Sequence, residues 1–133
     1  MSYDIAVDRD VQPYLLIVDD ELGVLEVTRS MALALGWRPL LASNAEHALA
    51  LFREHARSIE TALIDLHMPG MDGAELAGSM RAVSPGARLF FMTGDAVRAE
   101  ALVDGLHLAD GVLVKPFALE ELGRTIEFHA RPV

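Results

Sequence analysis

Short apolar runs that alternate with segments of helical periodicity constrain the fold of this chain most. Five runs of strand length are almost entirely apolar, at residues 15–18, 40–42, 61–64, 88–92 and 111–114. Continuous runs of this kind are typical of parallel strands that are covered on both faces. The alternation of strand and helix patterns therefore predicts an α/β domain.

The segments between these runs have the spacing of amphipathic helices. The first predicted helix ends at Gly36, which suits a left-handed C-terminal position, and Asn44 is the predicted N-cap of the second. A further helix is expected over about 97–105, where poor burial predicts mobility. The last helix contains Gly123, which is expected to loosen it. The residues predicted to face inward are Val24, Thr28, Met31 and Leu35, then Ala45, Ala48, Leu49 and Phe52, then Leu76, Met80 and Val83, and finally Leu119, Leu122 and Ile126.

Five strands alternating with five helices predict a doubly wound parallel sheet with helices on both faces, because crossovers between parallel strands are right-handed. The strand order 2-1-3-4-5, found in flavodoxin-like folds, fits the strand count. The folded domain is expected to cover residues 14–130. Residues 1–13 are expected to form a loose N-terminal tail, and residues 131–133 a short C-terminal one.

The composition of the chain excludes several classes of partner and of binding site. The 133 residues include 20 acidic and 11 basic side chains, which gives a net charge of −9, so neither nucleic acid nor an anionic membrane is an expected partner. Cysteine is absent, which excludes disulfides and thiolate metal sites. No apolar run has the length of a membrane span, and the acidic N-terminus does not match a signal peptide. A cytoplasmic protein is therefore expected.

Polar residues follow four of the apolar runs. Asp19 and Asp20 follow the first run, and Asp65 follows the third. Thr93 and Lys115 follow the fourth and the fifth. Open α/β sheets bind ligands outside the carboxyl ends of their strands, where the strand order reverses, here between the first and third strands. All five residues are therefore expected to meet in one crevice, although an aspartate before a turn is, by itself, as often a turn former.

Such a cluster suits a metal ion and a phosphate group. Two carboxylates about 4 Å apart repel by roughly 4 kcal/mol at an effective dielectric constant of about 20. A hard divalent cation relieves this repulsion, and Mg²⁺ characteristically binds one or two carboxylates, water and phosphate oxygens. A carboxylate can also attack phosphorus and form an aspartyl phosphate. Mg²⁺ and the ammonium group of Lys115 would then stabilise the developing charge, with the hydroxyl of Thr93 as a donor.

Taken together, these residues resemble the receiver domain of bacterial two-component response regulators, which is related to the chemotaxis receiver, over about residues 14–130. The parts that carry the resemblance are Asp19-Asp20, Asp65 with residues 68–73, Thr93-Gly94 and Lys115-Pro116-Phe117. Each fragment is common alone, but their order and separations are specific.

The resemblance implies that Asp65 accepts a phosphoryl group from a sensor histidine kinase or a histidine phosphotransfer protein, as a phosphoprotein in a phosphorelay. Asp20, Asp65 and the backbone carbonyl of His67 would bind Mg²⁺, with Mn²⁺ as a substitute. Asp19 would act on the ion through water. The chain would not be an enzyme, because its only chemistry would be self-phosphorylation and slow self-dephosphorylation.

The resemblance also implies how the switch works. Thr93 and Lys115 would contact the phosphoryl oxygens, and the Lys115–Pro116 peptide would be cis, which X-Pro bonds permit at low cost. Where the family has Tyr or Phe, three residues before the lysine, this chain has Val112, which has no ring to turn inward. Switching is therefore expected through Thr93 and the segment 94–105. The output would be a downstream protein or a fused domain, and a homodimer is expected through the fourth helix, fifth strand and fifth helix.

Simpler interpretations apply to some of these residues. Asp72 precedes a helix and is better explained as an N-cap. The five histidines, His47, His55, His67, His107 and His129, lack a metal-binding spacing and are interpreted as surface residues.

Two other functions remain open from the sequence. An interaction module that works without phosphorylation commonly lacks one of the acidic residues or the lysine, all of which this chain has. A Mg²⁺-dependent phosphohydrolase would usually have a second aspartate two residues after its nucleophile, and neither Asp19 nor Asp65 is followed by one.

Overall fold

Five parallel strands form a single sheet in the order β2-β1-β3-β4-β5, as the sequence predicts. The computed structural model describes residues 13–70, 73–95, 97 and 108–129. The strands are β1 (Tyr14–Val18), β2 (Arg38–Ala42), β3 (Ile59–Asp65), β4 (Arg88–Thr93) and β5 (Gly111–Val114). The described helices are α2 (Leu22–Ala34), α3 (Ala45–Glu54), α4 (Gly73–Val83) and α6 (Leu119–His129). Asp72 and nearly all of the helix expected over 97–105 lie outside the described residues.

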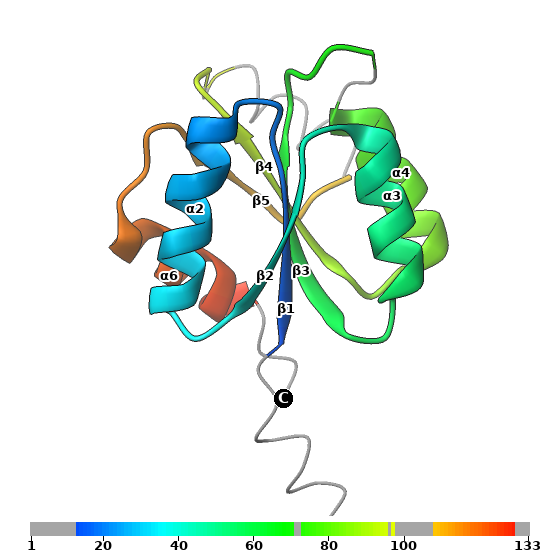
Figure 1. The fold of residues 1–133 in the computed structure, drawn as a ribbon, viewed down its shortest axis with the longest axis horizontal. Coiled ribbons are helices and arrows are strands. Elements are labelled where there is room, and N and C mark those ends of the chain that lie inside the picture. The colour runs from blue at the N-terminus through cyan, green and yellow to red at the C-terminus, as the bar shows by residue number, and fades with distance from the viewer. Residues whose placement is uncertain (1–12, 71–72, 96, 98–107, 130–133) are drawn as a thin grey trace, which may run out of the picture.

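The helices cover both faces of the sheet (Figure 1). Helices α2 and α6 lie on one face, and α3 and α4 lie on the other. Side chains along a strand alternate between the two faces, so Leu15 and Ile17 of β1 join the α2 and α6 side of the core, whereas Leu16 and Val18 join the other side. All four are completely buried. Burial on both faces explains why the strand is a continuous apolar run.

The predicted helix ends are present where the structure describes them. The side chain of Asn44 accepts a hydrogen bond from the backbone N–H of His47 at 2.7 Å and caps α3. Gly36 follows α2 with a φ of +90°, a left-handed conformation that favours glycine. No described helix combines the length and the apolar character that crossing a bilayer requires.

Two glycines have packing roles that the sequence does not reveal. A Cβ atom on Gly73 would lie 2.7 Å from the carbonyl oxygen of Asp65 and 2.9 Å from the Cα of Leu66. Helix α4 therefore begins directly against the backbone at the end of β3. Gly123 also lets α6 approach Leu35, whose Cδ2 would be 3.1 Å from an added Cβ.

Candidate functional site

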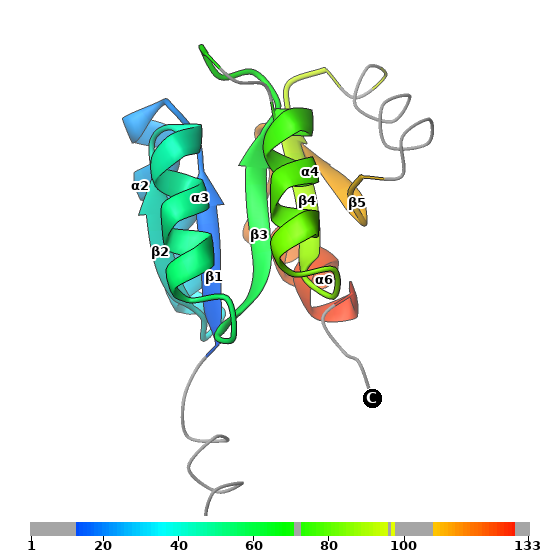
Figure 2. The same ribbon diagram turned by 90° about the vertical axis from the view of Figure 1, so that its right-hand side faces the viewer.

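The carboxyl ends of the strands meet at one edge of the sheet, as Figure 2 shows. Asp19 directly follows β1, and Asp65 is the last residue of β3. The structure brings Asp19, Asp20 and Asp65 together, with one carboxylate oxygen of each within 4.8 Å of the others. Thr93 ends β4 and Lys115 follows β5 at the same edge. The convergence expected from the strand order is therefore present.

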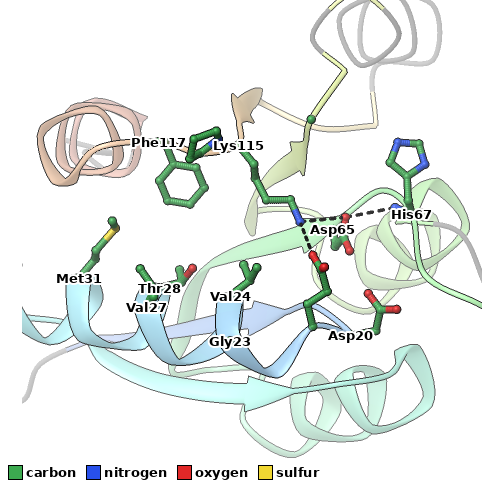
Figure 3. A pocket seen from close by; sticks show the side chains of 13 residues that line it. Asp20, Gly23, Val24, Val27, Thr28, Met31, Asp65, His67, Lys115 and Phe117 are labelled. Carbon is green, nitrogen blue, oxygen red and sulfur yellow. Dashed lines mark hydrogen bonds and ion pairs between the residues drawn. The ribbon is translucent and has the colours of Figure 1, made fainter.

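Lys115 is held by three carboxylates. Its Nζ lies 2.9 Å from Oδ2 of Asp19, 3.6 Å from Oδ1 of Asp65 and 3.8 Å from Oε1 of Glu21. Figure 3 shows the ammonium group of Lys115 pointing toward Asp65. Burial alone would lower the pKa of Lys115, but its hydrogen bond to Asp19 and the neighbouring negative charges outweigh burial and raise the pKa above 10.5. The lysine is therefore charged at neutral pH. The peptide bond between Lys115 and Pro116 is cis, as the resemblance implies.

Asp19 links the start of α2 to the lysine. Its carboxylate is completely buried, and Oδ1 accepts the backbone N–H of Glu21 at 2.9 Å while Oδ2 accepts from Lys115. Asp20, the next residue, is exposed. The two neighbouring acids therefore differ, because Asp19 has both oxygens occupied by protein groups and Asp20 faces solvent.

Asp65 combines burial with an available oxygen. Its side chain is almost fully buried, and Oδ1 accepts the backbone N–H of His67 at 3.2 Å. Among the described residues, both polar contacts of this carboxylate use Oδ1, and Oδ2 has none. Burial raises the pKa of Asp65 from 3.8 to about 6. The charges of Asp19 and Asp20 add to this rise, while the His67 N–H and Lys115 oppose it.

Thr93 has a partner that the sequence does not suggest. Its hydroxyl is completely buried, accepts the backbone N–H of Asp95 at 3.0 Å and lies 3.2 Å from Nε2 of His67. His67 is exposed, as expected, but its ring contacts the hydroxyl of Thr93. No spacing rule links residues that are 26 positions apart, so only the fold reveals this pair.

The other histidines give mixed results. His47 is exposed, as expected. His55 is partly buried, and the centroid of its ring lies 5.2 Å from that of Tyr14. His107 and the side chain of His129 lie outside the described residues.

A groove of about 970 Å³ leads from the acidic cluster along α2. Asp20, Asp65 and Lys115 line one end, while Val24, Val27 and Met31 of α2 face Phe117 along the remainder (Figure 3). Sequence reasoning missed this apolar wall, because it treated Val24 and Met31 as core residues. An available indication was Val27, which falls outside the predicted inward-facing stripe and is 57% exposed.

The donor atoms of the cluster fit a hard divalent cation. Three carboxylates approach one another closely, and two of them are removed from solvent, where their repulsion is poorly screened. Carboxylate oxygens are the ligands that Mg²⁺ prefers in proteins, whereas soft or imidazole-rich sites select other metals. The raised pKa of Asp65 is a direct consequence of this crowding and burial. A cation that binds here would favour the ionised carboxylate.

The site therefore places a buried aspartate, a buried hydroxyl and a lysine at one edge of a parallel sheet with the order β2-β1-β3-β4-β5. The sequence model of the response regulator receiver domain matches residues 15–127, and the chain belongs to this family. It is a receiver domain of the two-component signalling type.

Relatives and solved structures agree with this assignment. The chain is 33% identical to the two-component response regulator ARR14 of Arabidopsis thaliana over 109 residues, which cover 81% of this chain and 28% of ARR14. It is 36% identical to the virulence sensor protein BvgS of Bordetella pertussis, covering 81% of this chain and 9% of BvgS. The chain therefore matches one part of much longer proteins.

Among solved structures, a CheY-like response regulator receiver domain protein from Methanospirillum hungatei superimposes with a TM-score of 0.81 at 26% identity, covering 90% of this chain and 94% of that one. The response regulator protein TrrA from Thermotoga maritima, solved in complex with Mg(2+)-BeF, superimposes with a TM-score of 0.76 at 26% identity and covers 88% of this chain and 98% of TrrA.

Proposed function

We propose that Asp65 accepts a phosphoryl group from a phosphohistidine on a partner protein in a Mg²⁺-dependent reaction, and that the modification changes which partners the domain binds. The observation that carries this proposal is the arrangement around Asp65, a buried carboxylate whose Oδ2 is available and whose Oδ1 faces Lys115 at 3.6 Å. In the reaction, Oδ2 forms a bond to phosphorus, and the bond between phosphorus and the histidine nitrogen breaks.

Asp20 and Asp65 would hold Mg²⁺ together with the backbone carbonyl of His67, and Asp19 would act on the ion through water. The ion would neutralise the charge that develops on the phosphoryl oxygens. Mn²⁺ would serve as a substitute, because it shares the preference for carboxylate, carbonyl and water oxygens. The Mg²⁺ and beryllofluoride complex of TrrA supports this assignment by analogy.

Lys115 and Thr93 would hold the other side of the phosphoryl group. Lys115 is charged and already within 4 Å of Asp65, so it needs only a small movement to exchange Asp19 for a phosphoryl oxygen. The hydroxyl of Thr93 would donate a second hydrogen bond. One group per chain would be transferred, so the domain would modify only itself, with slow self-dephosphorylation, and would not turn over a substrate.

The donor would be a sensor histidine kinase or a histidine phosphotransfer protein. Access to Asp65 is through the groove along α2, so the donor would contact the apolar wall that Val24 and Val27 form. The signal would pass to a downstream protein or a fused output domain. The net charge of −9 argues against a direct role in nucleic acid binding and favours protein partners.

Val112 at the usual aromatic position is half-buried and packs against the apolar core on the α3 and α4 side. We propose that switching therefore operates through Thr93 and the segment 94–105, most of which lies outside the described residues. A homodimer through the helix predicted for that segment, β5 and α6 is the expected assembly. We also propose residues 14–130 as the domain boundaries and the cytoplasm as the location.

Mass spectrometry after incubation with acetyl phosphate and Mg²⁺ tests the proposal. The wild type should gain one phosphoryl group, whereas Asp65→Asn and the wild type in excess chelator should gain none. Glu60→Gln, which removes an exposed carboxylate from the same strand, is the matched control and should react like the wild type. Rapid multiple turnover of acetyl phosphate without a lasting labelled species would indicate a phosphohydrolase, and no labelling would indicate an interaction module.

A further inference from the structure

His67 connects the two ends of the proposed switch. Its backbone N–H donates to Oδ1 of Asp65 at 3.2 Å, and its ring Nε2 lies 3.2 Å from Oγ1 of Thr93. The ring is turned away from the Asp65 carboxylate, as Figure 3 shows. One residue therefore contacts the acceptor through its main chain and the buried hydroxyl through its side chain.

The hydroxyl of Thr93 is held by groups other than the acceptor. A threonine hydroxyl has one proton to donate and two lone pairs. Here Oγ1 accepts the N–H of Asp95 at 3.0 Å and shares a hydrogen bond with His67, in which donor and acceptor depend on the ring tautomer. Within the described part of the chain, no hydrogen bond joins Thr93 to Asp65. The hydroxyl must therefore leave His67 to reach a phosphoryl group.

We propose that His67 is a positioning residue whose ring holds the Thr93 hydroxyl in the resting orientation, so that the strength of this contact sets how readily the switch reaches its occupied state. The inference rests on the proposed function of Asp65 and Thr93. It assigns to the His67 side chain a role separate from that of its backbone carbonyl.

The location of the ring supports a role in positioning rather than in packing. His67 is exposed and belongs to neither apolar cluster of the core, so its side chain is not needed to bury apolar surface. Thr93, in contrast, is completely buried, which leaves its hydroxyl few groups with which to pair. Removing the ring should therefore free the hydroxyl without unfolding the domain.

The first test measures the side-chain rotamer of Thr93 by NMR, from couplings to its methyl group, without any phosphodonor or metal. The wild type should show one dominant rotamer and His67→Ala a mixture. His67→Gln, which keeps a hydrogen-bonding group, should restore a dominant rotamer. His47→Ala removes another exposed histidine and should behave like the wild type. An unchanged Thr93 rotamer in His67→Ala overturns the proposal.

The second test measures binding of beryllofluoride with Mg²⁺, which imitates a phosphoryl group. His67→Ala should bind about 2- to 10-fold more tightly, the range expected when one net hydrogen bond no longer opposes the change. In a Thr93→Val background, the same substitution should have no effect. An equal effect in both backgrounds would show that His67 acts on access to Asp65 and would overturn the proposal. If no variant bound beryllofluoride, the proposed function would fail, and the rotamer measurement alone would decide the role of His67.

Discussion

Asp65→Asn should stabilise the metal-free protein at neutral pH. The pKa of Asp65 is about 6 in the folded chain and 3.8 in the unfolded one. The folded state therefore binds more protons between these values, and stability falls as the pH rises through them. The difference of about 2.2 units corresponds to about 3 kcal/mol above pH 6, because one unit is about 1.4 kcal/mol. A neutral asparagine avoids this loss, and the melting temperature should rise by about 10 °C.

The dependence on pH separates this cause from other effects of the substitution. Linkage predicts that the gain shrinks from about 3 kcal/mol at pH 7.5 to roughly half of that at pH 5.0, since the wild-type carboxyl is then largely protonated in the folded state. Urea denaturation in the presence of a chelator measures both values. Glu60→Gln is the matched control, and as an exposed surface change it should shift stability by less than about 0.5 kcal/mol. A gain that is absent at pH 7.5, or equally large at pH 5.0, would refute the reasoning.

Three further outcomes are expected. Lys115→Met should destabilise the fold by about 3 kcal/mol in urea denaturation, because it leaves the carboxylate of Asp19 buried without its cation, and an unchanged midpoint would contradict this account. Gly73→Ala should lower the melting temperature, since its Cβ would meet backbone atoms at 2.7 and 2.9 Å, whereas Gly78→Ala in the same helix meets nothing within 4 Å and should stabilise by about 0.5–1 kcal/mol. Mg²⁺ at about 100 times its dissociation constant should stabilise the wild type by about 2.7 kcal/mol in a thermal melt and Asp20→Asn by clearly less, and equal shifts would place the ion elsewhere.

The order of the elements follows from the sequence because burial on both faces leaves a simple pattern. The apolar runs at 15–18 and 61–64 predict strands that are covered on both faces. Five such strands fit the order 2-1-3-4-5. The strand ends are harder to predict. Strand β1 begins at Tyr14, whose ring lies 3.8 Å from the guanidinium carbon of Arg38 and beside the ring of His55. These contacts join residues that are distant in sequence, so the local pattern of residues cannot predict where the strand begins.

The positions of the site residues were predictable for a similar reason. Parallel strands end at the same edge of a sheet, so a polar residue at the end of such a strand lies at that edge. Asp65 and Thr93 could therefore be placed together from the sequence alone. The direction of each side chain was not predictable. The contact of the His67 ring with Thr93 and the approach of Glu21 to Lys115 depend on loop conformations after the strands. Val27 lies outside the predicted inward-facing stripe of its helix. Its exposed apolar side chain is explained by the groove that it lines.

The instability of the acidic cluster is itself part of how such a switch could work. In the metal-free state, ionisation of a buried carboxylate with a pKa of about 6 lowers the stability of the fold. This loss of stability is comparable to the stabilisation that a well-bound cation would provide. Lys115 compensates only partly, because its 2.9 Å contact is with Asp19 and its distance to Asp65 is 3.6 Å. A cation and a phosphoryl group would therefore redistribute contacts that the resting site leaves incomplete. The hydroxyl of Thr93 pairs with His67 and Asp95 in the resting site, and it is the group whose contacts we expect to change.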